Sequence, residues 1–348
     1  MTPSDLTAAV KSLAREVGFA RVGIAPAGPV QHAEKFRRWL DCGWHARMAY
    51  MADHPDKRSR PDLLVPGARS VICLAVGYAP ARPQPRGQVR VARYARGRDY
   101  HKVLKRRCRA LIDGIRRIAP SFYGRAFVDS APVMERTLAA AAGLGWIGRN
   151  GCLIVPQLGS YVVLAEIVCN LDLRPDAPLA RRCGKCTRCV EACPTGALGD
   201  DALVDARICI SYLTVEHRGP IDPRLWAKMG AGVFGCDACQ AGCPYNQDLP
   251  AGDAELLDAP APLGGASLAG LLGAAEQDWD AATRGSAVRR AKWPVLLRNA
   301  VIAAGNIPPP DLTDADALAA ALRRIRKEHP ELRQLAQWAL ERLGRPGA

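Results

Sequence analysis

The sequence predicts an α+β protein of several domains: a layered α/β N-terminal domain, a cysteine-rich insert and a small all-helical C-terminal domain. Short β-favouring runs alternate with helical periodicity in the first half of the chain. Short cysteine spacings then replace apolar periodicity, and only helical periodicity remains at the end. At 348 residues the chain is longer than one compact core usually accommodates. We therefore expect domains at residues 1–175, 176–255 and 256–348.

Residues 1–175 carry the signals of a sheet covered by helices. The β-favouring runs are Val22 to Ala25, Ser70 to Gly77, Arg125 to Asp129 and Tyr161 to Val168. Helical periodicity runs from Ser4 to Val17 and from Val103 to Ile118. The proline-rich stretch from Tyr78 to Gln88 is predicted as a loop, because proline sustains neither regular element there. The terminal helical pattern is typical of one helix pair of a HEAT-like repeat.

Composition limits the environment and the partners of the protein. No uninterrupted apolar run is long enough to span a membrane, and the N-terminus lacks the pattern of an export signal, so we expect a cytoplasmic protein. Thirteen cysteines in such a chain indicate metal binding rather than disulfides. The formal net charge of +14 favours a polyanionic partner, such as RNA, DNA or an acidic protein.

Four cysteines in the middle of the chain fit the C-x2-C-x2-C-x3-C-P spacing of bacterial two-cluster ferredoxins without adjustment. They are Cys183, Cys186, Cys189 and Cys193, and Pro194 follows the last of them. In such a run the first three thiolates face one four-iron, four-sulfur (4Fe-4S) cube and the fourth faces a second cube. The run therefore predicts a ferredoxin-like segment with two 4Fe-4S clusters.

The second half of this pattern recurs downstream with one cysteine displaced. Valine occupies position 233, where the pattern has a cysteine, and Cys209 is the predicted replacement. The crossed ligation of two-cluster ferredoxins then predicts two quartets of ligands. One quartet is Cys183, Cys186, Cys189 and Cys243, and the other is Cys193, Cys209, Cys236 and Cys239.

Two structural zinc sites are the alternative, since zinc also favours cysteines in C-x2-C pairs. Zinc sites do not call for a triple run followed by Cys-Pro, so we prefer the clusters. The other five cysteines are scattered singly and are read as small buried hydrophobes. They are Cys42, Cys73, Cys108, Cys152 and Cys169.

A dinucleotide fingerprint, G-x-G-x-x-G, is spelled by Gly143, Gly145 and Gly148. The fingerprint requires a strand before it and a helix after it. Here an alanine-rich helical stretch precedes it and a β-favouring stretch follows. We therefore interpret Gly143 as the C-cap of a helix and expect no nicotinamide site.

Basic residues are concentrated in two parts of the chain. Twelve Lys or Arg residues lie between Arg86 and Arg117, interleaved with Tyr94 and Tyr100. The second cluster consists of Arg284, Arg289, Arg290, Lys292 and Arg298, with Trp293. Such surfaces suit phosphate backbones, and aromatic side chains among them can stack on exposed bases. A solvated cationic face without a partner is the alternative.

Several longer motifs resemble those of the epoxyqueuosine reductases over nearly the whole chain. They are residues 93–95 (RYA) and 97–101 (GRDYH), 128–132 (VDSAP) with Glu135-Arg136, 145–150 (GWIGRN), 235–240 (GCDACQ) and 243–246 (CPYN), with residues 297–306 in the helical tail. The chain departs from the family pattern conservatively at Arg149 and Tyr245, where lysine and tryptophan often stand.

This resemblance implies reduction of epoxyqueuosine to queuosine at the wobble position of tRNA anticodons, the last step of queuosine biosynthesis. It also implies that cobalamin, reduced by electrons from the two clusters, lies between the N-terminal domain and the clusters. The histidine motif D-x-H-x-x-G of many corrinoid proteins is incomplete, because Leu104 stands where glycine is required. The family holds its corrinoid without a histidine ligand, so this absence is compatible with the resemblance.

The family's proton donor corresponds to Asp129. Burial beside a corrin is expected to raise the pKa of this carboxyl and to keep a proton available. The alternative for Asp129 is a cap on the helix expected near Pro132. The residues that the resemblance places at the corrin are Arg58, Tyr94, Asp129, Asn150, Leu153, Ser160, Cys236 and Asp237, with Leu153 acting through its backbone. Residues 211–219 and the basic clusters are the candidates for tRNA contact.

Two other functions use similar parts. A corrinoid reductive dehalogenase also sets a corrinoid beside two clusters, but such enzymes are usually exported and need no polyanion-binding surface. A ferredoxin-type electron carrier would need neither an acid at Asp129 nor a corrinoid. For the reductase we expect a monomer that takes electrons from an external donor.

Overall fold

A four-stranded antiparallel sheet forms the centre of the N-terminal half. The computed structural model describes residues 1–79, 89–199, 202–257, 267–307 and 315–345, so residues 80–88 of the predicted proline-rich loop lie outside the described residues. The strands run in the order β1-β2-β7-β4, each antiparallel to its neighbour. Their bounds are β1 (Arg21–Pro26), β2 (Ser70–Gly77), β7 (Val162–Cys169) and β4 (Gly124–Phe127). All four predicted β-favouring runs therefore meet in one sheet.

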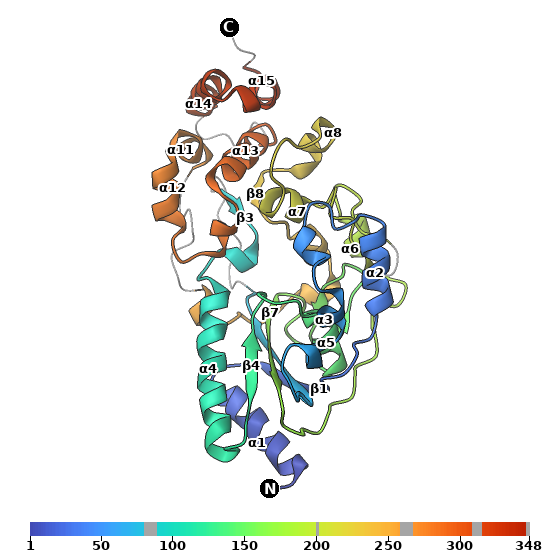
Figure 1. Ribbon diagram of the computed structural model, residues 1–348. Coiled ribbons are helices and arrows are strands. Elements are labelled where there is room, and N and C mark those ends of the chain that lie inside the picture. The colour runs from blue at the N-terminus through green and yellow to red at the C-terminus, as the bar shows by residue number, and fades with distance from the viewer. Residues whose placement is uncertain (80–88, 200–201, 258–266, 308–314, 346–348) are drawn as a thin grey trace.

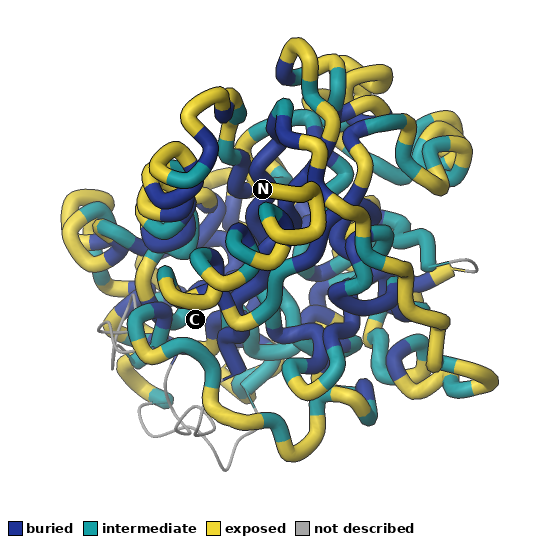
Figure 2. The backbone as a smooth tube through the Cα atoms, turned by 90° about the horizontal axis from the view of Figure 1, so that it is seen from below, coloured by how far each residue is buried: buried dark blue, intermediate teal, exposed yellow. Residues whose placement is uncertain are grey.

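Helices cover both faces of this sheet, which confirms the layered arrangement. Helices α1 (Pro3–Glu16) and α4 (Tyr100–Ile118) pack on one face, where Leu104 and Ile115 join Ile72 and Ile167 in one buried cluster. Helix α5 (Glu135–Ala141) packs on the other face, with Leu138 among its buried side chains. Figure 1 shows α1 and α4 together at the N-terminal end of the molecule, and Figure 2 shows the buried backbone surrounded by exposed segments.

The G-x-G-x-x-G stretch has the predicted context. Helix α5 precedes it, Gly143 follows that helix with φ of +73°, and the two-stranded pair β5 (Trp146–Ile147) and β6 (Leu153–Ile154) comes after it. A Cβ atom on Gly145 would lie 2.1 Å from the carbonyl oxygen of Ile154, so glycine is required there by this close approach.

The cysteine-rich segment consists of short helices and loops. Its helices are α6 (Arg188–Glu191), α7 (Ile210–Val215), α8 (Pro223–Trp226) and α9 (Ala238–Ala241). Helix α6 packs against α9, and a Cβ atom on Gly242 would lie 2.8 Å from the Cβ atom of Ala192. Strand β8 (Gly232–Phe234) pairs in parallel with β3 (Arg90–Val91), which joins this segment to the N-terminal half.

The C-terminal part is helical, as predicted, and its helices from residue 293 onward lie at the end of the molecule opposite the N-terminus (Figure 1). Residues 254–257 form a short helix that packs against α4 of the N-terminal half. The helices of the C-terminal part are α10 (Ala254–Leu257), α11 (Leu268–Gly273), α12 (Glu276–Thr283), α13 (Trp293–Ala304), α14 (Ala315–Glu328) and α15 (Arg333–Arg342). The two remaining helices, α2 (Ala33–Asp41) and α3 (Pro55–Ser59), belong to the N-terminal half. Helix α13 is apolar and buried on nearly all sides. None of the helices in the described ranges has the length and apolar character that crossing a membrane requires.

Two buried polar residues on α13 bind the cysteine-rich segment. Arg298 is 4% exposed, and its guanidinium donates to the carbonyl oxygens of Leu213 (2.6 Å), His217 (3.1 Å) and Gly219 (2.6 Å). The amide of Asn299 donates to the carbonyl oxygens of Thr214 (2.8 Å) and Val233 (2.9 Å). The terminal helices are therefore hydrogen-bonded to α7, which directly follows the displaced Cys209, and to β8, which directly precedes the loop of Cys236 and Cys239.

Replacing Arg298 by methionine should lower the free energy of unfolding by about 2 to 4 kcal/mol. The methionine side chain leaves three carbonyl oxygens without the donor that satisfies them, and each buried orphan is costly. The check is the urea midpoint for loss of helical circular dichroism. The matched control is Arg323→Met on the exposed face of α14, which should leave this midpoint unchanged; equal midpoints for both variants would contradict the prediction.

Candidate active site

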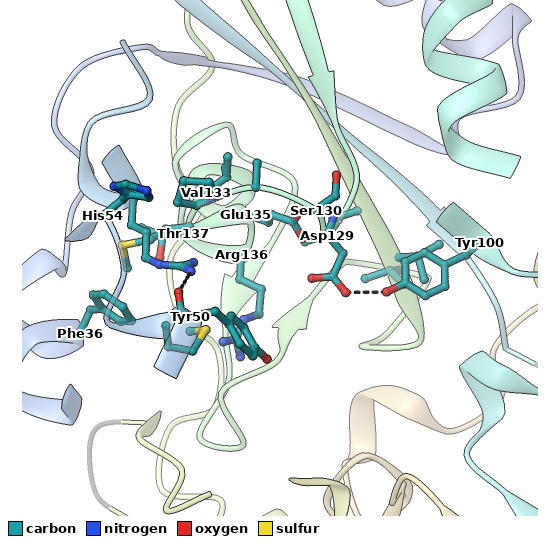
Figure 3. Close-up of a pocket in the computed structure, with 18 of the residues that line it drawn as sticks. Phe36, Tyr50, His54, Tyr100, Asp129, Ser130, Val133, Glu135, Arg136 and Thr137 are labelled. Carbon is teal, nitrogen blue, oxygen red and sulfur yellow. Dashed lines mark hydrogen bonds between the residues drawn. The ribbon is translucent and has the colours of Figure 1, made fainter. Parts of the chain in front are cut away.

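A cavity of about 910 Å³ opens between the sheet, the loop after β4 and the segment around Tyr50 (Figure 3). This volume lies near the upper end of the range for sites that bind small molecules. Residues 129–137 and 162–164 form one wall, Tyr94 and Tyr100 form a second, and Arg290 from the terminal half also lines the cavity. The cavity therefore combines residues from the sheet domain and the helical part.

Asp129 stands on the wall of this cavity, two residues beyond the end of β4. Its backbone has φ of +46°, a left-handed conformation that is uncommon outside glycine. Its carboxylate accepts a hydrogen bond from the Tyr100 hydroxyl at 2.7 Å, drawn as a dashed line in Figure 3. The Nε2 atom of His101 lies 3.8 Å from the same oxygen, a separation suited to an ion pair. Asp129 does not cap α5, which begins at Glu135 with Met134 as its N-cap residue and no side-chain cap.

The Asp129 side chain is 64% exposed, and its protonation differs from the expectation that burial would raise its pKa. Desolvation raises the pKa of Asp129, but the interactions with His101 and Tyr100 outweigh it and bring the pKa below its ordinary value. Desolvation lowers the pKa of His101, while the carboxylates of Asp129 and Asp99 raise it to about 9. The Nδ1 atom of His101 lies 2.7 Å from Asp99. At neutral pH the proton therefore resides on His101 and Asp129 is ionised, opposite to the pKa direction expected from burial alone.

The eight residues that the resemblance assigns to a corrin are not all at the cavity. Arg58 and Tyr94 line it together with Asp129. The lining does not include Asn150, Leu153, Ser160, Cys236 and Asp237. Asn150 and Leu153 are buried near the β5-β6 pair, and Ser160 is buried and hydrogen-bonded to Gln240 and Asn246. Asp237 accepts a hydrogen bond from the backbone N–H of Arg93 at 2.9 Å.

Two of these residues carry buried donors that find no partner within the described part of the chain: the Nε atom of Arg58 and the side-chain nitrogen of Asn150. The Nη2 atom of Arg58 donates a hydrogen bond to the carbonyl oxygen of Tyr50 at 2.6 Å. A buried donor without an acceptor is costly, so both atoms suit a ligand with carbonyl oxygens at its edge. The amide side chains of a corrin are such groups, and these residues fit it.

The first predicted cysteine quartet is brought together in space. Burial raises the pKa of the Cys243 thiol, and the charges of Cys189, Cys183 and Cys186 raise it further, so the four thiols lie within electrostatic reach of one another. Cys189 and Cys243 are buried, whereas Cys183 and Cys186 are partly exposed. Cys243 lies 54 residues or more beyond the other three cysteines and joins them through the packing of α6 on α9.

The second quartet is grouped in the same way around the displaced Cys209. Burial raises the pKa of the Cys236 thiol, and the charges of Cys209 and Cys193 act in the same direction. Burial also raises the pKa of the Cys239 thiol, and the charges of four other cysteines raise it further: Cys152, Cys236, Cys209 and Cys193. In the described ranges no three metal-ligating side chains converge tightly enough for a single ion. A four-iron cube takes one thiolate at each iron and requires no such convergence.

The loop of Cys236 lies against the cavity wall. Gly235 adopts φ of +69°, and a Cβ atom there would lie 2.5 Å from the Cβ of Ala92 and 3.6 Å from the ring of Tyr94. Tyr94 lines the cavity on its other side. The second quartet is therefore separated from the cavity by little more than one aromatic side chain, which places a cluster ligand next to the candidate site.

The predicted basic surface is only partly available to a polyanion. Arg298 is internal, and the expectation that it faces a phosphate backbone is wrong, because the donors of its guanidinium are taken up by carbonyl oxygens and by Asn299. Arg290 forms an ion pair with Glu216 at 2.7 Å. Lys292 is exposed, and it follows the cavity residue Arg290 by two positions. Helix α4 presents an outward basic face made of Lys102, Lys105, Arg106, Arg109, Arg116 and Arg117.

Sequence reasoning assigned no role to four side chains around Asp129. Tyr100 and His101 contact its carboxylate, the side chain of Glu135 accepts a hydrogen bond from its backbone, and Glu166 lies behind Glu135. One signal was present in the sequence: Glu166 is a single charged residue within the apolar strand Val162–Cys169. A lone carboxylate in a strand that is buried on both faces requires a partner or a proton.

Fold and site together define an iron–sulfur oxidoreductase, in which a double-cluster segment adjoins a cavity with an acid–base group. The family model "4Fe-4S double cluster binding domain" matches residues 182–246, which contain all eight predicted ligands. A second family model, "Epoxyqueuosine reductase QueG, DUF1730", matches residues 58–130. These two segments include Arg58, Tyr94, Asp129 and Cys236.

The chain belongs to the epoxyqueuosine reductase family. The epoxyqueuosine reductase of Pseudomonas aeruginosa is 40% identical over 98% of this chain and 96% of its own length. The enzyme of Escherichia coli K12 is 37% identical over 97% of this chain and 89% of its own length. A crystal structure of epoxyqueuosine reductase with an epoxyqueuosine-modified tRNA-Tyr stem loop superposes with a TM-score of 0.85 at 27% identity, covering 99% of this chain and 91% of that one. The Bacillus subtilis enzyme, solved with its catalytic aspartate loop swung out of the active site, gives a TM-score of 0.85 at 27% identity, covering 98% and 91% of the two chains.

Proposed function

We propose that this protein reduces epoxyqueuosine to queuosine at the wobble position of a tRNA anticodon. The observation that carries the proposal is the cavity itself, which is lined by Asp129, with His101 behind it, and by Tyr94, which is backed by the loop of Cys236. Removal of the epoxide oxygen as water consumes two electrons and two protons. The cluster held by the Cys236 loop can deliver electrons to the cavity, and the Asp129–His101 pair can deliver protons.

The cavity is the proposed site of cobalamin, and bound cobalamin supplies a strongly reducing cobalt centre beside the epoxide. Arg58, which lines the cavity, offers its unpaired buried donor to the amide groups of cobalamin. Asn150, whose unpaired donor is also buried, lies outside the lining and is proposed as a second contact. Leu153 and Ser160 hold the neighbouring loops, with Ser160 fixed by Asn246 at 2.8 Å. The protein's own contribution is to position the reacting groups and to keep bulk water away from them.

Asp129 is the proposed catalytic acid, and His101 is its proton source. Asp129 faces the cavity, whereas His101 is set behind it on α4 and bridges to Asp99. Because the pKa of His101 is about 9 and that of Asp129 lies below its ordinary value, the pair holds one proton at neutral pH. Transfer from His101 through Asp129 to the departing oxygen completes the acid step.

The two cysteine quartets are the proposed cluster ligands, assigned as the sequence predicts. We assign residues 1–175 to the corrin, residues 176–255 to the clusters and residues 256–348 to a HEAT-like helical domain. The stem-loop is proposed to reach the cavity past Tyr50 and Arg290, where an anticodon base can be splayed from its stack into a pocket. A cytoplasmic monomer supplied by an external electron donor is the simplest form of this enzyme.

The test is conversion of an epoxyqueuosine-containing anticodon stem-loop by anaerobically purified protein with cobalamin and a strong reductant. We expect queuosine to form only when cobalamin is present. A ferredoxin-type electron carrier or a dehalogenase would leave the stem-loop unchanged, and a protein with intact clusters that binds no cobalamin would support the carrier.

Stem-loop affinity should fall steeply with salt, because phosphate contacts release counterions. Lys292→Gln should reduce the slope of log affinity against log salt by about 0.7 to 0.9, the share of one phosphate contact. The control is Arg117→Gln at the far end of α4, which should leave the slope unchanged. Filter-binding titrations at several salt concentrations provide the measurement, and a slope that changes with Arg117 instead would move the binding face to α4.

A further inference from the structure

Behind Asp129, a pair of carboxyl groups leads from the cavity wall into the core. Glu166 lies in the middle of β7 opposite Cys73 on β2 and Phe127 on β4, on the sheet face that α5 covers. Its side chain is 0% exposed. Glu135, the first residue of α5, stands between Glu166 and the cavity.

Glu166 cannot remain ionised in this environment. Neither of its carboxylate oxygens has a hydrogen-bond donor within the described residues, and an unpaired buried carboxylate is prohibitively costly. Burial and the charges of Glu135 and Asp129 raise the pKa of Glu166 well above its ordinary value. Once protonated, Glu166 becomes a donor, and the side chain of Glu135 is the acceptor within its reach.

Glu135 in turn holds the backbone of the residue that faces the cavity. Its Oε1 atom accepts the backbone N–H of Asp129 at 2.7 Å. Asp129 has the left-handed φ of +46°, which is strained for a residue with a Cβ. A hydrogen bond to an ionised acceptor is short and strong enough to offset that strain. The Asp129 side chain is held separately, by Tyr100 on α4.

We propose that Glu166 is a neutral carboxylic acid that donates a hydrogen bond to the carboxylate of Glu135, and that Glu135, so fixed, positions Asp129. Glu135 is a positioning residue, since it acts on Asp129 rather than on the substrate. The proposal rests on the proposed function only in taking Asp129 as the acid. Its structural content, a buried proton and a tethered loop, is independent of any activity.

The difference in exposure along Asp129, Glu135 and Glu166 accounts for an anionic outer acid and a neutral innermost one: the Asp129 side chain is 64% exposed, whereas Glu166 is 0% exposed. The pKa of Glu135 is raised to about 7, chiefly by desolvation and also by the charge of Asp129. The hydrogen bond from the Asp129 backbone, the charge of Arg136 and the hydrogen bond with Glu166 lower this pKa and limit the rise. The thiol of Cys73 also packs here and has its pKa raised by burial and by Glu166. Glu135 and Glu166 therefore share a single proton, which resides on Glu166.

Three readouts on the cluster-loaded, cobalamin-bound protein test the proposal. Infrared difference spectra above neutral pH should contain the carbonyl stretch of a protonated carboxylic acid, because exposed carboxyls are then ionised. This band should be lost in Glu166→Gln. Hydrogen exchange of the Asp129 amide should be about tenfold faster in Glu135→Ala, which lacks the acceptor, and close to wild type in Glu135→Gln, which retains one.

The kinetic readout separates positioning from binding. Glu135→Ala should lower the single-turnover rate by on the order of a hundredfold while the dissociation constant of the stem-loop stays unchanged, and Glu135→Gln should restore most of the rate. The control is Asp172→Ala, which removes an exposed carboxylate of the same domain paired with Arg69. It should match wild type in all three readouts.

An unchanged infrared band in Glu166→Gln, or unchanged exchange of the Asp129 amide in Glu135→Ala, would overturn the proposal. If Glu135→Ala does not fold, the infrared measurement on Glu166→Gln and the two readouts on Glu135→Gln still decide the proposal. Faster exchange of the Asp129 amide together with a lower single-turnover rate in Glu135→Gln would contradict rescue by a retained acceptor. Wild-type protein that fails to reduce the stem-loop would refute the proposed function instead, while the infrared and exchange results would still stand.

Discussion

Asp129→Asn should lower the single-turnover rate of epoxyqueuosine reduction by about a thousandfold, the range expected for loss of a general acid. Asparagine has the same shape, and its amide oxygen can still accept the Tyr100 hydroxyl. It cannot pass on a proton. The measurement uses pre-reduced enzyme and excess stem-loop, so that electron supply does not limit the rate. Retention of more than about a tenth of the wild-type rate would remove Asp129 from the acid role.

The pH dependence of the same reaction identifies the proton source. His101 has its pKa raised to about 9, so it is protonated below that value and loses its proton as the pH rises through it. The Asp129 pKa is lowered, so Asp129 stays ionised throughout this range. The single-turnover rate should therefore be level near neutral pH and fall above about 9. His101→Asn should abolish this fall, and a variant that keeps it would show that another group supplies the proton.

Cys209→Ala should remove about half of the iron and sulfide and abolish reduction of the stem-loop. Cys209 lies outside the regular spacing, but its thiol is grouped with Cys193, Cys236 and Cys239. A cube with three thiolates is labile, and it adjoins the cavity through the Cys236 loop. Iron analysis and electron paramagnetic resonance of the dithionite-reduced protein provide the measurement.

Cys42→Ala is the matched control, because Cys42 is an exposed cysteine outside both quartets. It should retain the full iron content and activity. Full iron content in Cys209→Ala would mean that a different residue completes the second cluster. Because Cys152 lies near both quartets, Cys152→Ala then becomes the next variant to examine.

The sequence predicted the strands and the cysteines because both signals are local. Strand runs such as Ser70 to Gly77 and the C-x2-C spacings are set within ten residues or so. The strand order β1-β2-β7-β4 could not be predicted in this way, since it depends on how segments up to 99 residues apart, such as Ser70 and Cys169, pair across the sheet. Cys209 was found only because the ferredoxin pattern left one ligand unfilled.

The electrostatics of the site escaped prediction for the same reason. Asp129 meets Tyr100 and His101 from a helix that precedes it by 28 residues or more, so the lowering of its pKa follows from tertiary packing. Arg298 was read as part of a basic surface because a count of charges carries no information on burial. Glu166 was missed as well, although a lone carboxylate in an apolar strand is visible in the sequence.

The attachment of α13 to the cysteine-rich segment also constrains the order in which the protein matures. Ribosomes deliver Cys209 and Cys236 well before Arg298 and Asn299, whose side chains hold the carbonyl oxygens of the intervening loops. Until α13 has emerged and docked, those loops lack their anchors. We therefore expect the second cluster to be held stably only after α13 has docked, so that a nascent polypeptide stalled before residue 298 should be a poor recipient of iron.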